Sequence, residues 1–229
     1  MKIFFNGCSW TYGKELEDRE NSRFSSLLGK TFDAEVVNVS KPGSSNHRLL
    51  RSTYEYCDPS TYDVAVLQFT FPARTEYYSD DSHTPSREGK FMKITPTCLV
   101  NSRTKNSAAH QDYRNRYYET AYSEELGHTT EYMVFQALQD YFFRYNVPVI
   151  TLTLNRDSVL PYDLLLNTAD VPRAEGGHPN EKGHQVIARK IESIIRNGNQ
   201  VVDAKKAHLN RIKRTHERPI NPIDQTDYR

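Results

Sequence analysis

Short apolar runs alternate with amphipathic, helix-like segments along most of this 229-residue chain. The runs are too short for typical helices and are rich in β-branched and aromatic residues, which predicts buried strands. They cover residues 1–5, 35–39, 63–69, 147–154 and, more weakly, 163–166. Strands and helices that follow one another in turn predict an α/β fold with a central, mostly parallel sheet of about five strands and helices on both faces.

The segments between these runs have the apolar spacing of helices. A helix over 21–28 should stop at Gly29, and another should follow the turn at 41–45 and carry Leu49, Leu50 and Tyr54. Helical character returns over 112–125, and Asn180 is placed to cap a last helix that ends near Gly198. One further helix face is predicted from the spacing of Phe135, Leu138, Phe142 and Tyr145.

Two regions depart from this alternation. Residues 78–106 are polar and irregular, and they exceed the length of an ordinary connection, so we expect an insert or lid rather than a second core. Residues 199–229 form a basic C-terminal extension with six Lys and Arg side chains between 205 and 218. The predicted organisation is one domain over 1–198, with the insert at about 78–106, followed by the extension over 199–229.

Composition argues against several classes of protein. A net charge of +1 gives no general attraction to nucleic acid or anionic membranes. Three cysteines without a Cys-x-x-Cys pair argue against a disulfide framework or a cysteine-rich zinc site. The first residues do not have the pattern of a signal peptide, and no run approaches the ~20 apolar residues of a membrane span. A cytoplasmic location is therefore expected.

The first strand runs directly into Gly7-Cys8-Ser9, so a serine should stand at the carboxyl edge of the sheet. In open α/β sheets this edge is where ligands bind. Gly-x-Ser is also common in ordinary strand-to-loop turns, so on spacing alone Ser9 is better read as a loop residue.

A second stretch, residues 175–184, favours a catalytic interpretation. Glu175 precedes His178 by three residues in a glycine-containing loop just ahead of the last helix. A carboxylate can orient an imidazole so that its other nitrogen takes a proton from a serine hydroxyl. A solvent-facing polar loop would have the same composition, and this stretch alone does not decide between the two.

Together the two stretches resemble the SGNH (GDSL-type) hydrolase family. Its first block is matched by residues 7–13, and its last block, Asp-x-x-His-Pro followed by Gly-His, is matched by residues 175–184. The resemblance implies a three-layer, flavodoxin-like sandwich and a catalytic triad of Ser9, His178 and Glu175. Glu175 stands where the family has aspartate. Cys8 also replaces an aspartate, and we expect it to be a small buried residue.

The same resemblance implies an oxyanion hole formed by the N–H groups of Ser9 and Gly43 with one side-chain donor. Where the family has a donor asparagine, this chain has Thr70, with Gln68 two residues earlier. Removing one such donor can reduce turnover about a hundredfold to a thousandfold. Asn46 is the preferred substitute, and Thr70 and Gln68 remain alternatives.

Two side chains near these blocks are candidates for substrate contact. Trp10 could wall an acyl pocket or pack in the core, and Arg74 could contact substrate or form a surface ion pair with Glu76. No cofactor or metal is expected, because His178 and His184 are six residues apart rather than four. His184 is expected to be structural.

The leading hypothesis is therefore a metal-independent serine esterase or deacylase. Its substrate would be a small-molecule or glycan ester with a short acyl group on a polar carrier. The alternative is a catalytically weak or inactive binding module of the same fold. For residues 205–218 a solvated helix face is the first interpretation, a partner-binding arm the second and a nucleic-acid contact the third.

Overall fold

The computed structural model describes residues 1–78, 91–96, 108–158 and 160–198. Five parallel strands form the central sheet in the order β2-β1-β3-β6-β7. The strands are β1 (Lys2–Asn6), β2 (Glu35–Asn38), β3 (Val64–Phe69), β6 (Val149–Thr153) and β7 (Leu164–Leu165). This is the strand order of doubly wound, flavodoxin-like folds, and it confirms the fold class predicted from the alternation.

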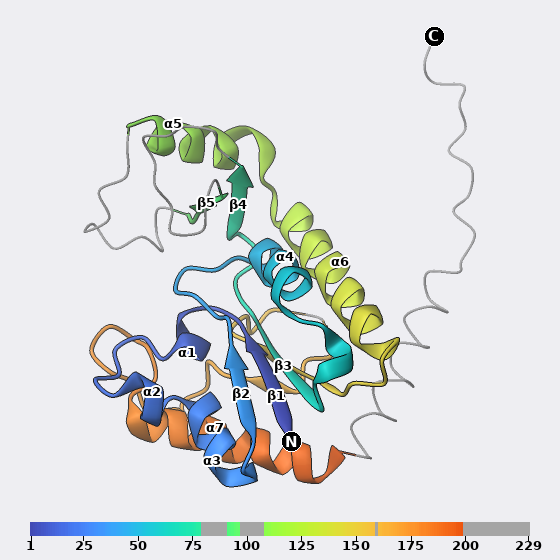
Figure 1. Cartoon of the computed structure of the whole chain (residues 1–229). Helices are drawn as coiled ribbons and strands as arrows, with labels where there is room; N and C mark the ends of the chain where they lie inside the picture. Colours follow the sequence, from blue (N-terminus) through green and yellow to red (C-terminus); the bar gives the residue numbers. More distant parts are fainter. Residues whose placement is uncertain (79–90, 97–107, 159, 199–229) are drawn as a thin grey trace.

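Helices cover both faces of this sheet (Figure 1). One face carries α2 (Arg19–Ser22), α3 (Phe24–Phe32) and α7 (Glu181–Arg196), and the other carries α4 (Asn46–Tyr56) and α6 (Glu124–Phe143). The short helix α1 (Ser9–Tyr12) lies beyond the carboxyl end of β1, and a 3-10 turn (Pro59–Thr61) precedes β3. The result is the three-layer arrangement that the sequence predicted.

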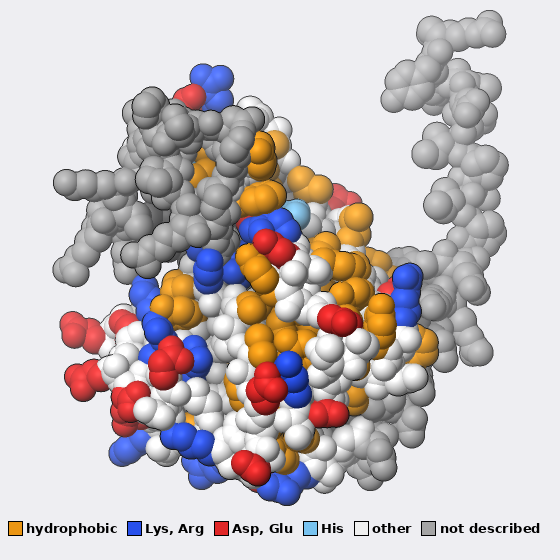
Figure 2. Space-filling view, in the orientation of Figure 1, with side chains coloured by type: hydrophobic (Ala, Val, Ile, Leu, Met, Phe, Trp, Pro, Cys, Tyr) orange, Lys and Arg blue, Asp and Glu red, His pale blue; other side chains and the backbone are white. Residues whose placement is uncertain are grey.

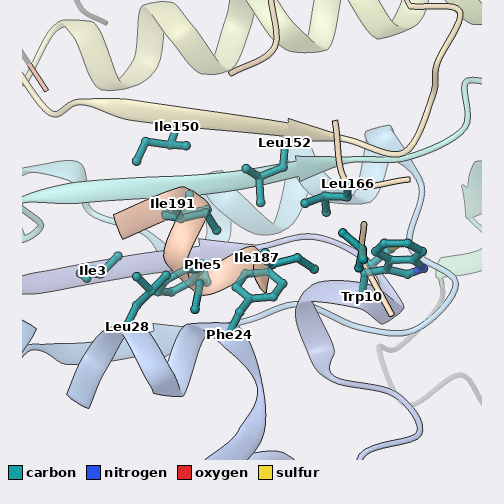
Figure 3. Close-up of a cluster of buried hydrophobic side chains, with 14 of the residues drawn as sticks. Ile3, Phe5, Trp10, Phe24, Leu28, Ile150, Leu152, Leu166, Ile187 and Ile191 are labelled. Atoms are coloured by element: carbon teal, nitrogen blue, oxygen red, sulfur yellow. The ribbon is translucent and has the colours of Figure 1, made fainter. Parts of the chain in front are cut away.

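Alternate residues of each central strand enter different cores. Phe5 of β1 joins the cluster beneath α3 and α7, which Figure 3 shows with Phe24, Ile187 and Ile191 around it. Phe4 instead packs beneath α4 and α6, with Phe69 and Phe142 in the same cluster. A strand buried on both faces has to be apolar throughout, which explains why β1 and β3 read as continuous apolar runs.

Three predicted helix boundaries were wrong. Gly29 lies inside α3, which continues to Phe32, and so does not end the helix. Glycine is needed here because a Cβ would meet Val36 Cγ2 of β2 at 2.8 Å. The helical stretch predicted over 112–125 is divided: α5 (Ala108–Arg116) passes into a π-helical turn (Tyr117–Ala121), and Ser123 then caps α6. Tyr145 lies past the end of α6 and is 48% exposed.

A small lobe stands beyond the carboxyl end of the sheet (Figure 1). It contains the antiparallel pair β4 (Thr75–Tyr78) and β5 (Phe91–Ile94), together with α5 and the π-helical turn. Of the predicted insert at 78–106, the structure describes only Tyr78, the last residue of β4, and residues 91–96, which include β5. The extension over 199–229 also lies outside them, and the domain boundaries remain a prediction.

The surface mixes both signs of charge. Figure 2 shows acidic and basic side chains interspersed over the sheet domain, as expected for a net charge of +1. Within the described ranges, no helix has the length and apolar character needed to cross a membrane.

Candidate active site

Ser9 begins α1 at the carboxyl edge of the sheet, three residues after the end of β1. The turn that carries it needs glycine at position 7, because a Cβ there would meet Thr11 Oγ1 at 2.6 Å and Gln68 Cβ at 2.7 Å. Ser9 is 7% exposed, and its hydroxyl donates to Cys8 Sγ at 3.8 Å. A buried serine at a helix start therefore occupies the ligand-binding edge predicted for it.

The side chain of Gln68, in β3, holds this turn through several hydrogen bonds. Its Oε1 accepts from Cys8 N at 3.3 Å, from Thr11 N at 3.2 Å and from Thr11 Oγ1 at 2.6 Å. Its Nε2 donates to Cys8 Sγ at 2.9 Å and to the Phe69 carbonyl at 3.3 Å. The amide is thus fully used in holding the Ser9 turn, so Gln68 is a positioning residue and does not fit the role of oxyanion donor.

His178 lies in the loop before α7 and pairs with a carboxylate from the opposite end of the sequence. Its Nδ1 is 2.8 Å from Glu15 Oε2, and its backbone N–H donates to the same oxygen at 3.1 Å. Gly176 makes room for this pair, because a Cβ at that position would lie 1.7 Å from Glu15 Oε1. With Nδ1 bonded to the carboxylate, the lone pair of the neutral ring is on Nε2.

The carboxylate that contacts His178 in the structure is Glu15 and not Glu175, the residue expected from the sequence. A tight turn explains the difference: Gly177 N donates to Ala174 O at 3.0 Å, and Ala174 N donates to His178 O at 2.8 Å. Glu175 sits within this turn and is exposed. Glu15 lies six residues after Ser9, so one short segment carries both the serine and the partner of the histidine.

The environment of this pair keeps the imidazole neutral and the carboxylate ionised. Burial lowers the pKa of His178, with further lowering by the charges of Lys14 and Arg74, and these effects outweigh the raising effect of Glu15. Burial alone would raise the pKa of Glu15, but hydrogen bonds from His178 bring it below its usual range. A neutral histidine beside an ionised carboxylate is suited to act as a general base near neutral pH.

The turn that carries Gly43 is joined to the turn that carries Ser9 by a backbone hydrogen bond. Lys41 N donates to Gly7 O at 3.2 Å. Gly43 in this turn has φ of 74°, a left-handed conformation that favours glycine. Among the described residues, the N–H groups of Ser9 and Gly43 donate to no protein acceptor. These are the two backbone donors predicted for the oxyanion hole.

The preferred side-chain donor, Asn46, is occupied. Its Nδ2 donates to the Thr70 carbonyl at 3.3 Å, and its Oδ1 accepts from Thr70 N at 2.9 Å. This reciprocal pair ties the start of α4 to the end of β3 and explains why Asn46 is only 2% exposed. The Thr70 hydroxyl accepts from Arg74 Nη1 at 2.8 Å.

The two predicted substrate-contact residues have different surroundings. Trp10 is 7% exposed and lies in the apolar cluster of Figure 3, with the Arg173 guanidinium 5.5 Å from its ring centre. Core packing therefore accounts for Trp10. Arg74 lies beside Thr70 and close enough to His178 to affect its pKa, and it does not pair with Glu76, whose carboxylate binds Arg51.

One contact expected of an active triad is missing. The Ser9 hydroxyl donates a hydrogen bond to Cys8 Sγ and makes no hydrogen bond to His178. Catalytic hydrogen bonds are often long or misaligned until a ligand is bound. Sequence reasoning missed Glu15, whose only signal was its position six residues after the serine. It considered Gln68 only as an oxyanion donor, whereas the structure shows Gln68 holding the serine turn.

His184 is a structural residue, as predicted. It is fully buried, and its Nδ1 accepts from Phe24 N at 3.1 Å, while burial lowers its pKa to about 4. Within residues 1–78, 91–96, 108–158 and 160–198, no three His, Cys, Asp or Glu side chains are grouped to hold a metal ion. Metal independence remains a prediction.

No protein-family model matches the sequence, and no curated protein matches it significantly. The fold is similar to that of a carbohydrate esterase whose active site displays divergent catalytic and non-catalytic binding functions. That match has a TM-score of 0.50 at 13% identity and covers 86% of this chain and 64% of the esterase. The psychrotrophic esterase EstA from Pseudoalteromonas sp. gives a TM-score of 0.47 at 11% identity, over 87% of this chain and 98% of EstA. The acetyl xylan esterase Est2A from the rumen bacterium Butyrivibrio proteoclasticus gives a TM-score of 0.48 at 13% identity, over 87% of this chain and 64% of Est2A.

The protein is thus an α/β protein of flavodoxin-like topology that carries a buried serine and a carboxylate-paired histidine at the carboxyl edge of its sheet. The resemblance to the SGNH (GDSL-type) hydrolases seen in the two sequence blocks is confirmed at the level of the fold. Sequence identities of 11–13% to these structures show a shared fold and do not show which reaction this protein catalyses.

Proposed function

We propose that this protein is a serine ester hydrolase that acts through an acyl-enzyme on Ser9. The observation that carries the proposal is the Glu15–His178 pair, a neutral imidazole oriented by an ionised carboxylate at the sheet edge where Ser9 lies.

The proposed reaction begins when Ser9 turns from Cys8 toward His178. As Oγ attacks the ester carbonyl, its proton moves to Nε2 of His178 and the carbonyl electron pair moves onto oxygen. The N–H groups of Ser9 and Gly43 receive this oxyanion. The bond to the alcohol then breaks, His178 protonates the leaving oxygen, and water releases the acyl group by the reverse sequence.

A carboxylic ester with a short acyl group on a polar or carbohydrate-like carrier fits this site best. Trp10 packs in the core, and the serine turn is hydrogen-bonded to the polar side chain of Gln68. Solved structures of similar fold include an acetyl xylan esterase and a carbohydrate esterase. Acetyl esters of sugars are therefore the first substrates to assay.

The test combines labelling with turnover. Wild type should react with a fluorophosphonate, the modified peptide should contain Ser9, and p-nitrophenyl acetate should be hydrolysed. Ser9→Ala should abolish both reactions. Ser60→Ala is the control, because this exposed serine lies in the 3-10 turn before β3, at the opposite end of the strands. No labelling by wild type, or full activity in Ser9→Ala, would contradict the proposal.

A binding module is the second candidate function, and the absence of a Ser9–His178 hydrogen bond favours it. A module of this kind would bind acetylated oligosaccharides equally well before and after Ser9→Ala, and it would hydrolyse none of them. Calorimetric titration of both proteins with the same oligosaccharides, alongside the esterase assay, separates the two candidates.

A further inference from the structure

A basic side chain of the lobe reaches the turn that carries Gly43. Lys93 of β5 donates from Nζ to the Pro42 carbonyl at 2.8 Å, one residue before Gly43. A Cβ on Gly43 would lie 3.8 Å from Lys93 Cδ, so the lysine side chain runs along this turn. The turn is itself bonded to the serine turn through Lys41 N and Gly7 O. The Lys93 ammonium group therefore lies at a turn that is joined directly to the one carrying the serine.

Two further cations act on the catalytic histidine. Lys14 follows α1 and Arg74 follows β3, and the positive charges of both lower the pKa of His178. Charges separated by more than about 10 Å are largely screened at moderate ionic strength, so both cations lie near the imidazole. Glu15, the acidic neighbour of His178, is already bonded to the ring. The groups around the neutral histidine therefore carry an excess of positive charge.

Arg74 is only partly satisfied by the protein. Its Nη1 donates to Thr70 Oγ1 at 2.8 Å, but its Nε is buried and has no partner among the described residues. The carboxylate of Glu76, two residues further on, binds Arg51. No described carboxylate forms an ion pair with Arg74 or Lys14. Buried polar groups are nearly always paired, so a half-satisfied guanidinium beside a proposed active site indicates a place for an anion.

We propose that the carrier of the ester bears a negatively charged group, a carboxylate or a phosphate, and that Arg74, Lys93 and Lys14 bind it. The inference rests on the proposed esterase function and narrows the polar carrier to an anionic one. Arg74 directly precedes β4 and Lys93 lies in β5, so the lobe would select the carrier while the sheet edge carries the reaction. A guanidinium presents a planar pair of donors to such a group, and an ammonium adds a compact charge.

The test compares three acetyl esters that differ at one group. They are an acetylated methyl glucoside, the matching methyl glucuronoside with its carboxylate, and the same glucoside carrying a terminal phosphate. Acetate release by wild type should show kcat/KM at least about tenfold higher for one or both charged esters than for the neutral one. A preference for either supports the inference, and the larger preference identifies the group. It should weaken at about 1 M salt, where the screening length falls to about 3 Å.

Variants test the three assigned side chains. Arg74→Gln and Lys93→Gln should each reduce the preference for the charged ester about tenfold, mainly through a higher KM. Lys14 is exposed, so Lys14→Gln should reduce it only about threefold. Lys30→Gln is the control, because this exposed lysine lies in the last turn of α3, which leads to the amino end of β2. The preference is a ratio of two rates for one protein, so a partial loss of folded enzyme does not change it.

A second readout separates the charge of Arg74 from a structural contact. With the neutral ester, the acid limb of kcat/KM in Arg74→Gln should move to higher pH, because Arg74 lowers the pKa of His178. Arg74→Lys keeps the charge and should retain the wild-type limb and part of the preference. A structural role alone would not distinguish these two variants in this way.

The possible failures of the two proposals differ. Ser9-dependent hydrolysis with equal kcat/KM for the neutral and charged esters would overturn this inference and leave the esterase proposal intact. A preference that persists unchanged in both Arg74→Gln and Lys93→Gln would also overturn it. Wild type that hydrolyses none of the three esters and does not react with a fluorophosphonate would overturn both proposals together.

Discussion

At the scale of single residues, Glu15 contacts His178 from a backbone conformation that non-glycine residues rarely adopt. Glu15 has a φ of 73°, a conformation that non-glycine residues adopt at a cost of about 1–3 kcal/mol. Its carboxylate accepts from both the ring and the backbone of His178. Strained residues of this kind cluster at functional sites, and the contact explains what maintains the strain here.

Glu15→Gln should lower kcat about a hundredfold or more, because an amide does not hold the imidazole in the required tautomer. Glu15 raises the pKa of His178, so its loss should also move the acid limb of kcat/KM to lower pH. The measurement is a pH–rate profile for hydrolysis of p-nitrophenyl acetate.

Glu175→Gln is the matched control. Glu175 lies three residues from the same histidine but is exposed, so this variant should retain the wild-type rate and profile. If Glu175→Gln were the damaged variant and Glu15→Gln were not, the pairing in the structure would not be the catalytic one.

The sequence predicted Ser9, His178 and Gly43 at the sheet edge, but it paired His178 with Glu175, whereas the structure pairs it with Glu15. The reason is that the motif describes neighbours along the chain, and the Glu15–His178 contact joins residues 163 positions apart. Only the packing of the last loop against the segment after α1 brings them together. The same limit applies to Asn46, whose amide was expected to be free and is bonded to Thr70.

At the scale of elements, α7 is anchored to α3 by a buried histidine. His184 stacks on the Phe24 ring with centroids 5.6 Å apart and accepts its backbone N–H. This bond satisfies one of the free N–H groups at the start of α3. Strands and most helices were predicted from periodicity alone, but contacts of this kind were not, because periodicity does not show which helices are neighbours.

This anchor makes stability depend on pH. Burial lowers the pKa of His184 from 6.5 to about 4, so the unfolded state takes up its proton first as the pH falls. The neutral, buried His184 contributes fully to the free energy of unfolding above about pH 6.5, and this contribution is lost as the pH falls toward 4. The free energy of unfolding should decrease by up to about 3 kcal/mol from this group.

His184→Asn should remove this dependence, because asparagine offers an acceptor to Phe24 N but does not titrate. Urea unfolding at pH 7.0 and pH 5.0 should show a smaller difference for the variant than for wild type. Equal differences in the two proteins would show that His184 does not titrate as its burial implies.

At the scale of the whole molecule, an arginine of α4 joins the sheet domain to both strands of the lobe. Arg51 of α4 binds both carboxylate oxygens of Glu76 in β4, at 2.8 and 3.0 Å, and its guanidinium lies 4.0 Å from the Phe91 ring centre in β5. Glu76 is two residues from Arg74. The lobe was expected only as an irregular polar insert, because four-residue strands on either side of a long polar stretch give little periodic signal.

This connection predicts that disturbing the lobe will affect catalysis. The side chain of Glu76 is 5% exposed, so Glu76→Gln should reduce stability by on the order of 2 kcal/mol through loss of a charged hydrogen-bonded pair. Displacement of β4 should also disturb Arg74 and lower kcat for the acetyl ester several-fold. Glu55→Gln removes the other carboxylate bound to Arg51, which is 47% exposed, and should change both quantities little. Urea unfolding and steady-state kinetics on the two variants test this prediction. Equal losses of stability and kcat in both variants would show that the Arg51–Glu76 pair does not couple the lobe to the site. A loss of kcat confined to Glu76→Gln would show that the lobe positions part of the catalytic machinery.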